Sequence, residues 1–219
     1  MTFKNLTLIA FATVGCFAQA AQLATRTDLN NILGGAAVTD DFEGFAVPDF
    51  NQYSFDGVLN SSKVTSFGGP GLVNSGASYK RIGTKNYPAD FFVSGHHYFQ
   101  MTSKTLAAGS TVLEIDYTSP VIAMGLDVMD FSSYSGNVTM RVYSASGLLG
   151  VVNVNAPGAP DSKFLGWEDA NGIVGVTLTG THLWSPVIDN HEYGTVPEPA
   201  TMAALGLGAI GMARRKRKA

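Results

Sequence analysis

The chain has 219 residues, of which 45% are hydrophobic, 14% are charged and 25 are glycine. So little charge and so many turn-forming residues exclude a helical bundle, a coiled coil and a collagen-like fibre, and the single cysteine excludes a disulfide scaffold. Residues 21–195 hold eight cations against sixteen acids, a net charge of about −8 that argues against nucleic acid and anionic lipid as partners.

Residues 1–20 have the pattern of a secretory signal peptide. Lys4 supplies a positive start, an apolar stretch follows, and Ala18 and Ala20 have the small-x-small spacing that signal peptidase cleaves. We therefore predict cleavage after Ala20. Two alternatives stay open, namely a buried N-terminal helix and lipidation at Cys16.

Residues 21–37 are expected to form a lead-in segment with one short helix. Thr27 and Asp28 are placed to cap its first turn, because short polar side chains accept hydrogen bonds from free backbone N–H groups. Gly34-Gly35 is placed to end the helix just after Leu33.

Strand patterns dominate the chain that follows. Residues 111–117 and 137–143 alternate apolar and polar side chains, which is the period of a half-buried strand. Residues 144–147 give a turn signal between 137–143 and a partner strand at 148–154. Residues 121–128 form an apolar run that is continuous until Asp127, which is typical of a central strand.

Two further strands are predicted at 163–167 and 173–179, joined as a hairpin by the turn residues 168–172. The last strand is predicted at 187–193. Short strands are also expected near 64–67, 90–93 and 98–102. Strands at intervals of about 8–12 residues, with turn signals between them, predict an all-β fold over residues 38–194, an antiparallel β-sandwich.

Residues 195–219 have three parts in a fixed order. A short acidic motif bounded by prolines comes first, an apolar run predicted as a transmembrane helix over about residues 200–213 follows, and five cations come last. About thirteen helical residues span only about 20 Å of a roughly 30 Å hydrocarbon core, so the anchor is marginal. The cations should stay cytoplasmic by the positive-inside rule. The motif is Val196, Pro197, Glu198, Pro199 and Ala200, and the topology-setting cations are Arg214, Arg215, Lys216, Arg217 and Lys218.

This end of the chain resembles the PEP-CTERM sorting signal of Gram-negative bacteria. The resemblance implies recognition by an exosortase-type membrane enzyme, with processing near Pro197-Glu198-Pro199 and release to the cell surface or the extracellular polysaccharide matrix. The same segment is also described as an ice-binding-protein C-terminal domain, a label that refers to the tail. The alternative is a plain tail anchor without sorting.

The central domain is similar to the jelly-roll domain found upstream of this tail in many exosortase-sorted proteins. The similarity rests on Asp41-Phe42-Glu43-Gly44, on residues 117–125, on 164–166 with 172–178, and on 188–190. In related carbohydrate-binding jelly rolls, an acidic pair near the start and an aspartate in the last strand meet at a structural calcium ion. The resemblance therefore implies a tentative structural Ca²⁺ site at Asp41, Glu43 and Asp189, whose carboxylates are ligands of the kind calcium takes. The alternative is that these are solvent-facing turn residues.

Catalytic chemistry has little support in the sequence, and we assign no catalytic residue. Glu114 and Asp116 share a strand face, as a glycosidase pair would, but acids on the wet face of a sandwich give the same pattern. The histidines have no zinc-binding spacing. Aromatic residues are candidates for a sugar-stacking surface or for the core: Trp167, Trp184, Tyr53, Tyr79, Tyr87 and Tyr98.

The sequence thus predicts an exported, non-enzymatic protein of the cell surface or extracellular matrix that contacts polysaccharide. The alternative is a carbohydrate-active enzyme or a carbohydrate-binding module, and a third possibility is an ice-binding or adhesion protein. An enzyme should show a cleft with paired carboxylates, whereas a polysaccharide binder should show an exposed aromatic platform.

Overall fold

The computed structural model describes residues 20–84, 89–130, 135–182 and 185–194. These ranges contain an eleven-stranded network of antiparallel pairs, one α-helix and one 3-10 helix. The elements are β1 (Ala21–Leu23), α1 (Arg26–Leu33), β2 (Val38–Asp40), β3 (Gln52–Phe55), β4 (Ala77–Ile82), β5 (Phe91–Ser94), η1 (Tyr98–Gln100), β6 (Thr105–Ala108), β7 (Val112–Met129), β8 (Gly136–Ser144), β9 (Gly147–Ala156), β10 (Lys163–Gly180) and β11 (Val187–Gly194).

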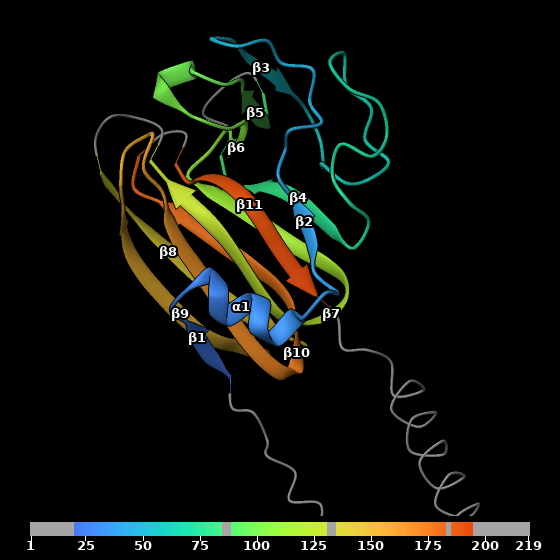
Figure 1. Cartoon of the computed structure of the whole chain (residues 1–219), viewed down its shortest axis with the longest axis vertical. Helices are drawn as coiled ribbons and strands as arrows, with labels where there is room; N and C mark the ends of the chain where they lie inside the picture. The colour runs from blue at the N-terminus through green and yellow to red at the C-terminus, as the bar shows by residue number, and fades with distance from the viewer. Residues whose placement is uncertain (1–19, 85–88, 131–134, 183–184, 195–219) are drawn as a thin grey trace, which may run out of the picture.

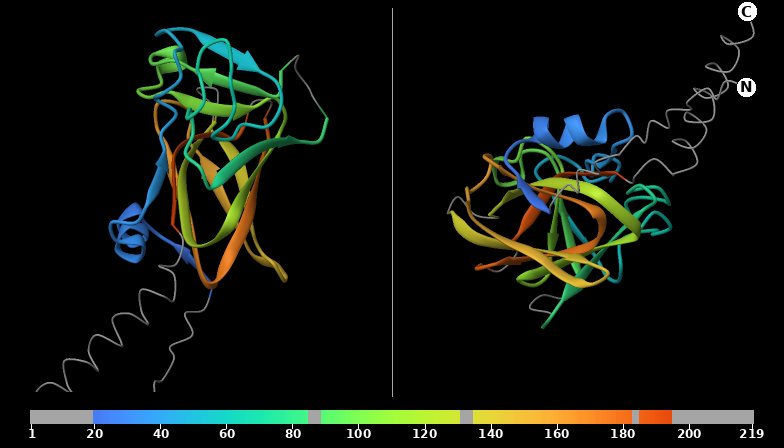
Figure 2. Two further views of the ribbon diagram at one scale, coloured as in Figure 1. Left: turned by 90° about the vertical axis from the view of Figure 1, so that its right-hand side faces the viewer. Right: turned by 90° about the horizontal axis from the view of Figure 1, so that it is seen from below.

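The strands form an antiparallel sandwich of the jelly-roll type, as predicted (Figure 1). The main path of neighbouring strands is β3-β5-β6-β11-β7-β10-β8-β9, while β1 pairs with β10, β2 with β11 and β4 with β7. β3, β5 and β6 lie together at the upper end in two perpendicular views (Figures 1 and 2). This upper end carries the loops that build the candidate site.

Two strands of 18 residues, β7 and β10, bend and run through both layers of the sandwich. The first part of β7 pairs with β4 and the last part of β10, and its second part pairs with β11 and the first part of β10. Both strands fold over at the lower end of the molecule (Figure 1). The predicted strands 111–117 and 121–128 are therefore two halves of one bent strand.

The predicted hairpin between 163–167 and 173–179 is wrong. Both segments belong to β10 and pair with β7 instead of with each other. β10 advances from Glu168 to Ile173 while β7 moves only from Ala123 to Val121, so the turn signal produces a bulge in a continuous strand. Gly172 adopts φ +98° there, a conformation that glycine reaches without the steric cost other residues meet.

The other strand predictions divide into two groups. Those at 137–143, 148–154, 187–193 and 90–93 are confirmed as β8, β9, β11 and β5, with small differences at the ends. Two are wrong, because 64–67 forms a loop with a single bridge to Gly68 and 98–102 contains η1. Five strands were not predicted from the sequence, namely β1, β2, β3, β4 and β6.

The segment predicted as a lead-in packs against the sandwich. β1 pairs with β10, and Leu29 and Leu33 of α1 form a buried cluster with Ala123. The helix is present, but Thr25 caps it instead of Thr27. The Thr25 hydroxyl accepts from the Asp28 backbone N–H at 3.1 Å, and the Asp28 carboxylate accepts from the Thr25 N–H at 2.9 Å, a capping box.

The main hydrophobic cluster lies between the layers and includes Phe45, Leu113 and Val176. A second cluster, which includes Met101 and Met129, lies beside the polar pocket described below. No helix within the described ranges is long and apolar enough to cross a membrane. The helix predicted at about 200–213 lies outside those ranges.

Candidate functional site

An exposed aromatic pair stands at the upper end of the molecule, and we call it the Phe50 platform. Phe50 is 70% exposed, and its ring stacks on the exposed His97 ring with centroids 5.2 Å apart and planes 26° apart. Phe50 precedes β3 and His97 follows β5; because these strands pair antiparallel, with Gln52 opposite Ser94, both loops lie at the same end of the pair. The Phe50 N–H donates to the His96 carbonyl at 2.8 Å, which fixes one loop on the other.

Charged side chains border this platform. The two ring nitrogens of His96 lie between carboxylates, with Nε2 3.1 Å from Glu43 Oε2 and Nδ1 3.2 Å from Asp49 Oδ1. Glu43 Oε1 accepts from the Lys104 backbone N–H at 2.9 Å, and Lys104 Nζ donates to the Glu43 carbonyl at 3.0 Å. Hydrogen-bonding groups of positive and of negative charge therefore lie beside the platform.

A polar pocket of about 200 Å³ lies close by, and we call it the Asp189 pocket. The Asp189 carboxylate accepts hydrogen bonds from the Ser103 hydroxyl and, at 2.7 Å, from the Asn190 backbone N–H. Burial raises the pKa of this carboxyl group to about 6, and the negative charges of Asp127 and Glu43 add to the effect. The residues that line the Asp189 pocket include Met101, Thr102, Ser103, Met129, Pro160, Asp189 and Asn190.

Unusual backbone conformations concentrate in the segments that build this end. Among the described non-glycine residues, the positive φ angles belong to Phe42, Phe50, His97, Gln100 and Asn190. Such conformations cost free energy outside glycine and persist where the surroundings impose them, often at functional sites. Asn190 also interrupts the pairing of β11 with β7.

Arg26 of α1 contacts Asn190, one of the residues that line the Asp189 pocket. Its guanidinium lies 3.0 Å from Asp127 and 2.9 Å from Glu192, and it donates to the Asn190 carbonyl at 3.1 Å. The Asn190 amide donates to Asp127 at 3.2 Å. This partly buried network holds the strained Asn190 in place and connects α1 to β7 and β11.

The three predicted calcium ligands all accept hydrogen bonds from donors of the protein itself. Asp41 accepts from the Glu43 backbone N–H at 3.1 Å, and Glu43 and Asp189 accept from the protein donors given above. Lys104 and His96 stand beside Glu43, which is a poor surrounding for a cation. The described ranges contain no group of three or more His, Cys, Asp or Glu residues able to hold a metal ion. The calcium site that the resemblance implies at Asp41, Glu43 and Asp189 stays a prediction.

The predicted pair Glu114 and Asp116 does share a face of β7, but Lys80 lies between the two carboxylates. The Lys80 ammonium forms an ion pair with Asp116 and lies 4.0 Å from Glu114. The hydrogen bond to Asp116 raises the pKa of Lys80, so the ammonium stays charged. Both carboxylates line one hollow, but Asp116 is held in the ion pair with Lys80, so we assign neither a catalytic role.

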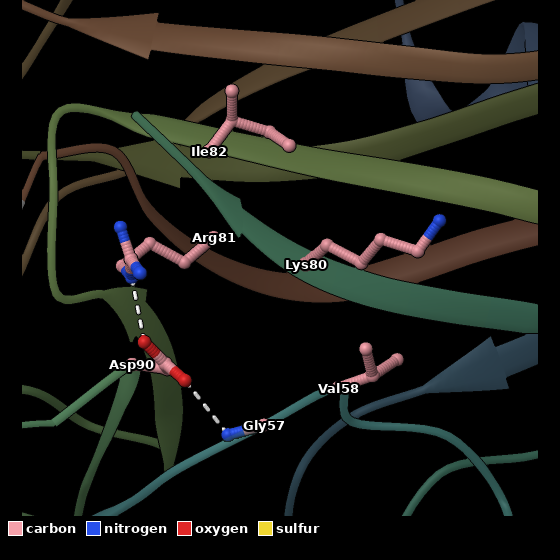
Figure 3. A pocket seen from close by; sticks show the side chains of 6 residues that line it. All are labelled: Gly57, Val58, Lys80, Arg81, Ile82 and Asp90. Carbon is pink, nitrogen blue, oxygen red and sulfur yellow. Dashed lines mark hydrogen bonds and ion pairs between the residues drawn. The ribbon is translucent and has the colours of Figure 1, made fainter. Parts of the chain in front are cut away.

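A further hollow of about 170 Å³ lies between β4 and the loop after β3 (Figure 3). Asp90 accepts from Arg81 Nε at 2.6 Å and from the Gly57 backbone N–H at 2.8 Å. Lys80 and Ile82 point away from this pair (Figure 3). The hydrogen bonds of Asp90 connect the upper loops to β4, and we interpret them as structural.

The aromatic residues proposed from the sequence are not the ones that form the platform. Trp167 and Tyr79 are buried in the core, Tyr98 is half-buried and Tyr53 is partly exposed. Tyr87 and Trp184 lie outside the described residues. The missed signal is Pro48-Asp49-Phe50-Asn51, where turn-forming residues surround an aromatic side chain and so predict an exposed loop.

A buried polar chain connects β2, β4, β7 and β11. Burial lowers the pKa of His191 to about 3, so its imidazole is neutral. The short contacts fit one assignment: Tyr117 donates to His191 Nε2 (2.9 Å), Nδ1–H donates to Tyr79 (2.7 Å), and Tyr79 donates to Asp40 (2.5 Å). Every member has a partner, which is the condition for a buried polar network to stabilise a fold.

The sorting residues and the basic tail lie outside the described residues, as does Ala18. Ala20 is half-buried and packs against the main core cluster. Residues 195–218 match the family described as the PEP-CTERM protein-sorting motif, which confirms the resemblance seen in the sequence. No curated protein matches the chain.

Three solved structures with a similar fold are carbohydrate-binding modules. One is a family 6 module, 12% identical over 64% of this chain and 95% of that chain, with a TM-score of 0.32. The second is a family 29 module from Piromyces equi, 14% identical over 67% and 89%, with a TM-score of 0.33. The third, from Clostridium stercorarium in complex with cellobiose, is 12% identical over 64% and 95%, with a TM-score of 0.31.

Proposed function

We propose that the chain is an exported, exosortase-sorted protein of the cell surface or extracellular matrix, and that its β-sandwich contacts polysaccharide through the Phe50 platform. Signal peptidase would remove residues 1–20, and an exosortase would process the chain near Pro197-Glu198-Pro199. The PEP-CTERM match at residues 195–218 supports the sorting part of this proposal.

The observation that carries the binding part is the exposed Phe50 ring stacked on His97. The Phe50 ring is 70% exposed on a backbone with positive φ, a conformation that persists where the surroundings impose it and that is frequent at functional sites. The C–H face of a sugar ring can pack on such an aromatic surface. Carboxylate, imidazole and ammonium groups beside the ring can then exchange hydrogen bonds with sugar hydroxyls.

The proposed role is non-enzymatic, but Asp189 supports a second candidate, a glycan hydrolase. A carboxyl group with a pKa near 6 in a polar pocket is the kind of group that serves as a general acid. Release of reducing ends from host polysaccharide by the wild type, lost in Asp189→Asn, would establish the hydrolase. Binding without such release supports the non-enzymatic role.

Affinity electrophoresis tests the platform. The processed protein, purified from its native host, is run through gels that contain the host's extracellular polysaccharide or a panel of neutral and acidic polysaccharides. Phe50→Ala removes the ring, and Leu148→Ala is the matched control, since Leu148 is 55% exposed on β9. We expect Phe50→Ala to weaken retention at least about tenfold and Leu148→Ala to leave it unchanged. Equal retention of Phe50→Ala and the wild type, at unchanged melting temperature, would refute the platform.

A further inference from the structure

A third hollow opens on the outer face of the sheet formed by β4, β7, β10 and β8. One row of residues crosses this sheet in register: Ser78 on β4, Asp116 on β7, Gly175 on β10 and Tyr143 on β8. Gly175 has no side chain, so the row is interrupted between a carboxylate and an aromatic ring. The result is a hollow of about 230 Å³, lined by Glu114, Asp116, Tyr143, Gly175 and Thr177, which we call the Gly175 notch.

The charges around the notch are balanced. Lys80 forms an ion pair with Asp116 and lies near Glu114, and Arg141 stands opposite Thr177 in the adjacent row. Two cations therefore accompany two anions. A strongly charged ligand would meet both attraction and repulsion here, whereas a neutral ligand with many hydroxyls can use all these groups as hydrogen-bond partners.

The shape of the notch suits a flat ring. The Tyr143 ring lies on one side, the carboxylates on the other, and the backbone of Gly175 forms the floor. A Cβ atom at Gly175 would lie 2.9 Å from the Ile115 backbone carbonyl oxygen, which is too close for a Cβ atom, so this close approach of β10 to β7 requires glycine. An aromatic wall facing hydrogen-bonding groups is the arrangement that recognises a ring with one apolar face and a hydroxylated edge.

The notch lies far from the Phe50 platform. Tyr143 is close to the β8–β9 turn and Gly175 close to the Gly172 bulge, where the long strands fold over at the lower end (Figures 1 and 2). The platform is carried by the loops of β3 and β5 at the upper end. Two sites at opposite ends of one sandwich favour contact with two polymer chains over doubled contact with one chain.

We propose that the Gly175 notch is a second site for a neutral sugar ring, and that the domain bridges polysaccharide chains by holding one at each end. The bridging part rests on the proposed function of the Phe50 platform, while the notch stands on its own geometry. A protein of this kind would reinforce a polysaccharide matrix without changing it chemically.

Bridging is measured as the rise in viscosity of a polysaccharide that retains the wild type, with affinity electrophoresis as the parallel measure of binding. Tyr143→Ala opens the notch, and Tyr143→Leu, which keeps an apolar side chain without the aromatic ring, is the second variant in case Tyr143→Ala disturbs the fold. Val151→Ala is the matched control, because Val151 is 45% exposed on β9 beside Arg141. Melting temperatures check that each variant is folded.

We expect Tyr143→Ala and Tyr143→Leu to keep binding through the platform, within about threefold of the wild type, and to lose the rise in viscosity. Phe50→Ala with Tyr143→Ala should lose binding altogether. Bridging by folded notch variants at the wild-type level would overturn the notch and leave the proposed function standing. Loss of binding in Tyr143→Ala, with full binding in Phe50→Ala, would support the notch and refute the platform. A wild type retained by no polysaccharide would refute both.

Discussion

The carboxyl group of Asp189 is buried, so its ionisation costs free energy in the folded protein. Because folding raises its pKa from the ordinary 3.8 to about 6, its stabilising contribution is fully present below about pH 4 and is lost as the pH rises through about 6. Asp189→Asn should therefore raise the free energy of unfolding at pH 8, by up to about 3 kcal/mol, and change it little at pH 4. Urea unfolding at the two pH values measures this difference, and an equal effect at both would contradict it.

Folding shifts the pKa of His191 downward, so its effect on stability changes with pH in the opposite direction to that of Asp189. Its pKa falls from 6.5 to about 3 on folding, so its contribution is present above pH 6.5 and is lost as the pH falls toward 3. The wild type should lose about 1.4 kcal/mol of stability per pH unit through this group, whereas His191→Gln should lack that slope. Subtracting the unfolding free energies of the two proteins at each pH cancels the other titrating groups. A difference that does not change with pH would rule out a neutral buried imidazole.

Single residues of the site were harder to predict than the elements that carry them. Asp189 and Glu43 were selected from the sequence and do lie at the upper end, but as acceptors for protein donors. Phe50 and His97 were not selected, because their role depends on two loops from separate strands and on positive φ angles. Sequence patterns give which side chains alternate along a strand, but not which loop tips meet across it.

At the scale of elements, the cap of α1 gives a direct test. Thr25→Ala removes the hydroxyl that accepts from the Asp28 N–H and should cost about 1 kcal/mol. Thr27→Ala is the matched control, because Thr27 is exposed within the same helix and should change stability by less than about 0.5 kcal/mol. Chemical denaturation of both variants gives the comparison. A larger loss for Thr27→Ala would place the cap where the sequence alone suggested it.

Several strands could be predicted from the alternation of apolar and polar residues, but the way in which the strands pair could not. β8, β9 and β11 were predictable because apolar and polar residues alternate between clear turn signals. The Glu168–Gly172 segment carries the same turn signals as a hairpin, and only the pairing with β7 shows that it is a bulge. β4 was missed because adjacent Lys80 and Arg81 break its alternation, since Lys80 faces solvent while Arg81 is held by Asp90.

For the whole molecule, the sorting motif is expected to decide whether the chain is released or stays in the membrane. Replacing Pro197-Glu198-Pro199 with three alanines should leave the chain attached to the membrane, because the exosortase would no longer recognise it. Fractionation of host cells that express the wild type or the variant measures this. Substitution of Thr201 with alanine is the control, because it lies just after the motif. Normal release of the triple variant would contradict exosortase sorting.

The central claim is that a processed domain reaches the outside of the cell and stays with polysaccharide there. The most direct test is the intact mass of the protein in each fraction of its native host. We predict a mass that corresponds to residues 21 to about 197, found in the extracellular polysaccharide fraction and shifted to the free soluble fraction by Phe50→Ala. A mass that includes residues 200–219, found only in the inner membrane, would contradict the account.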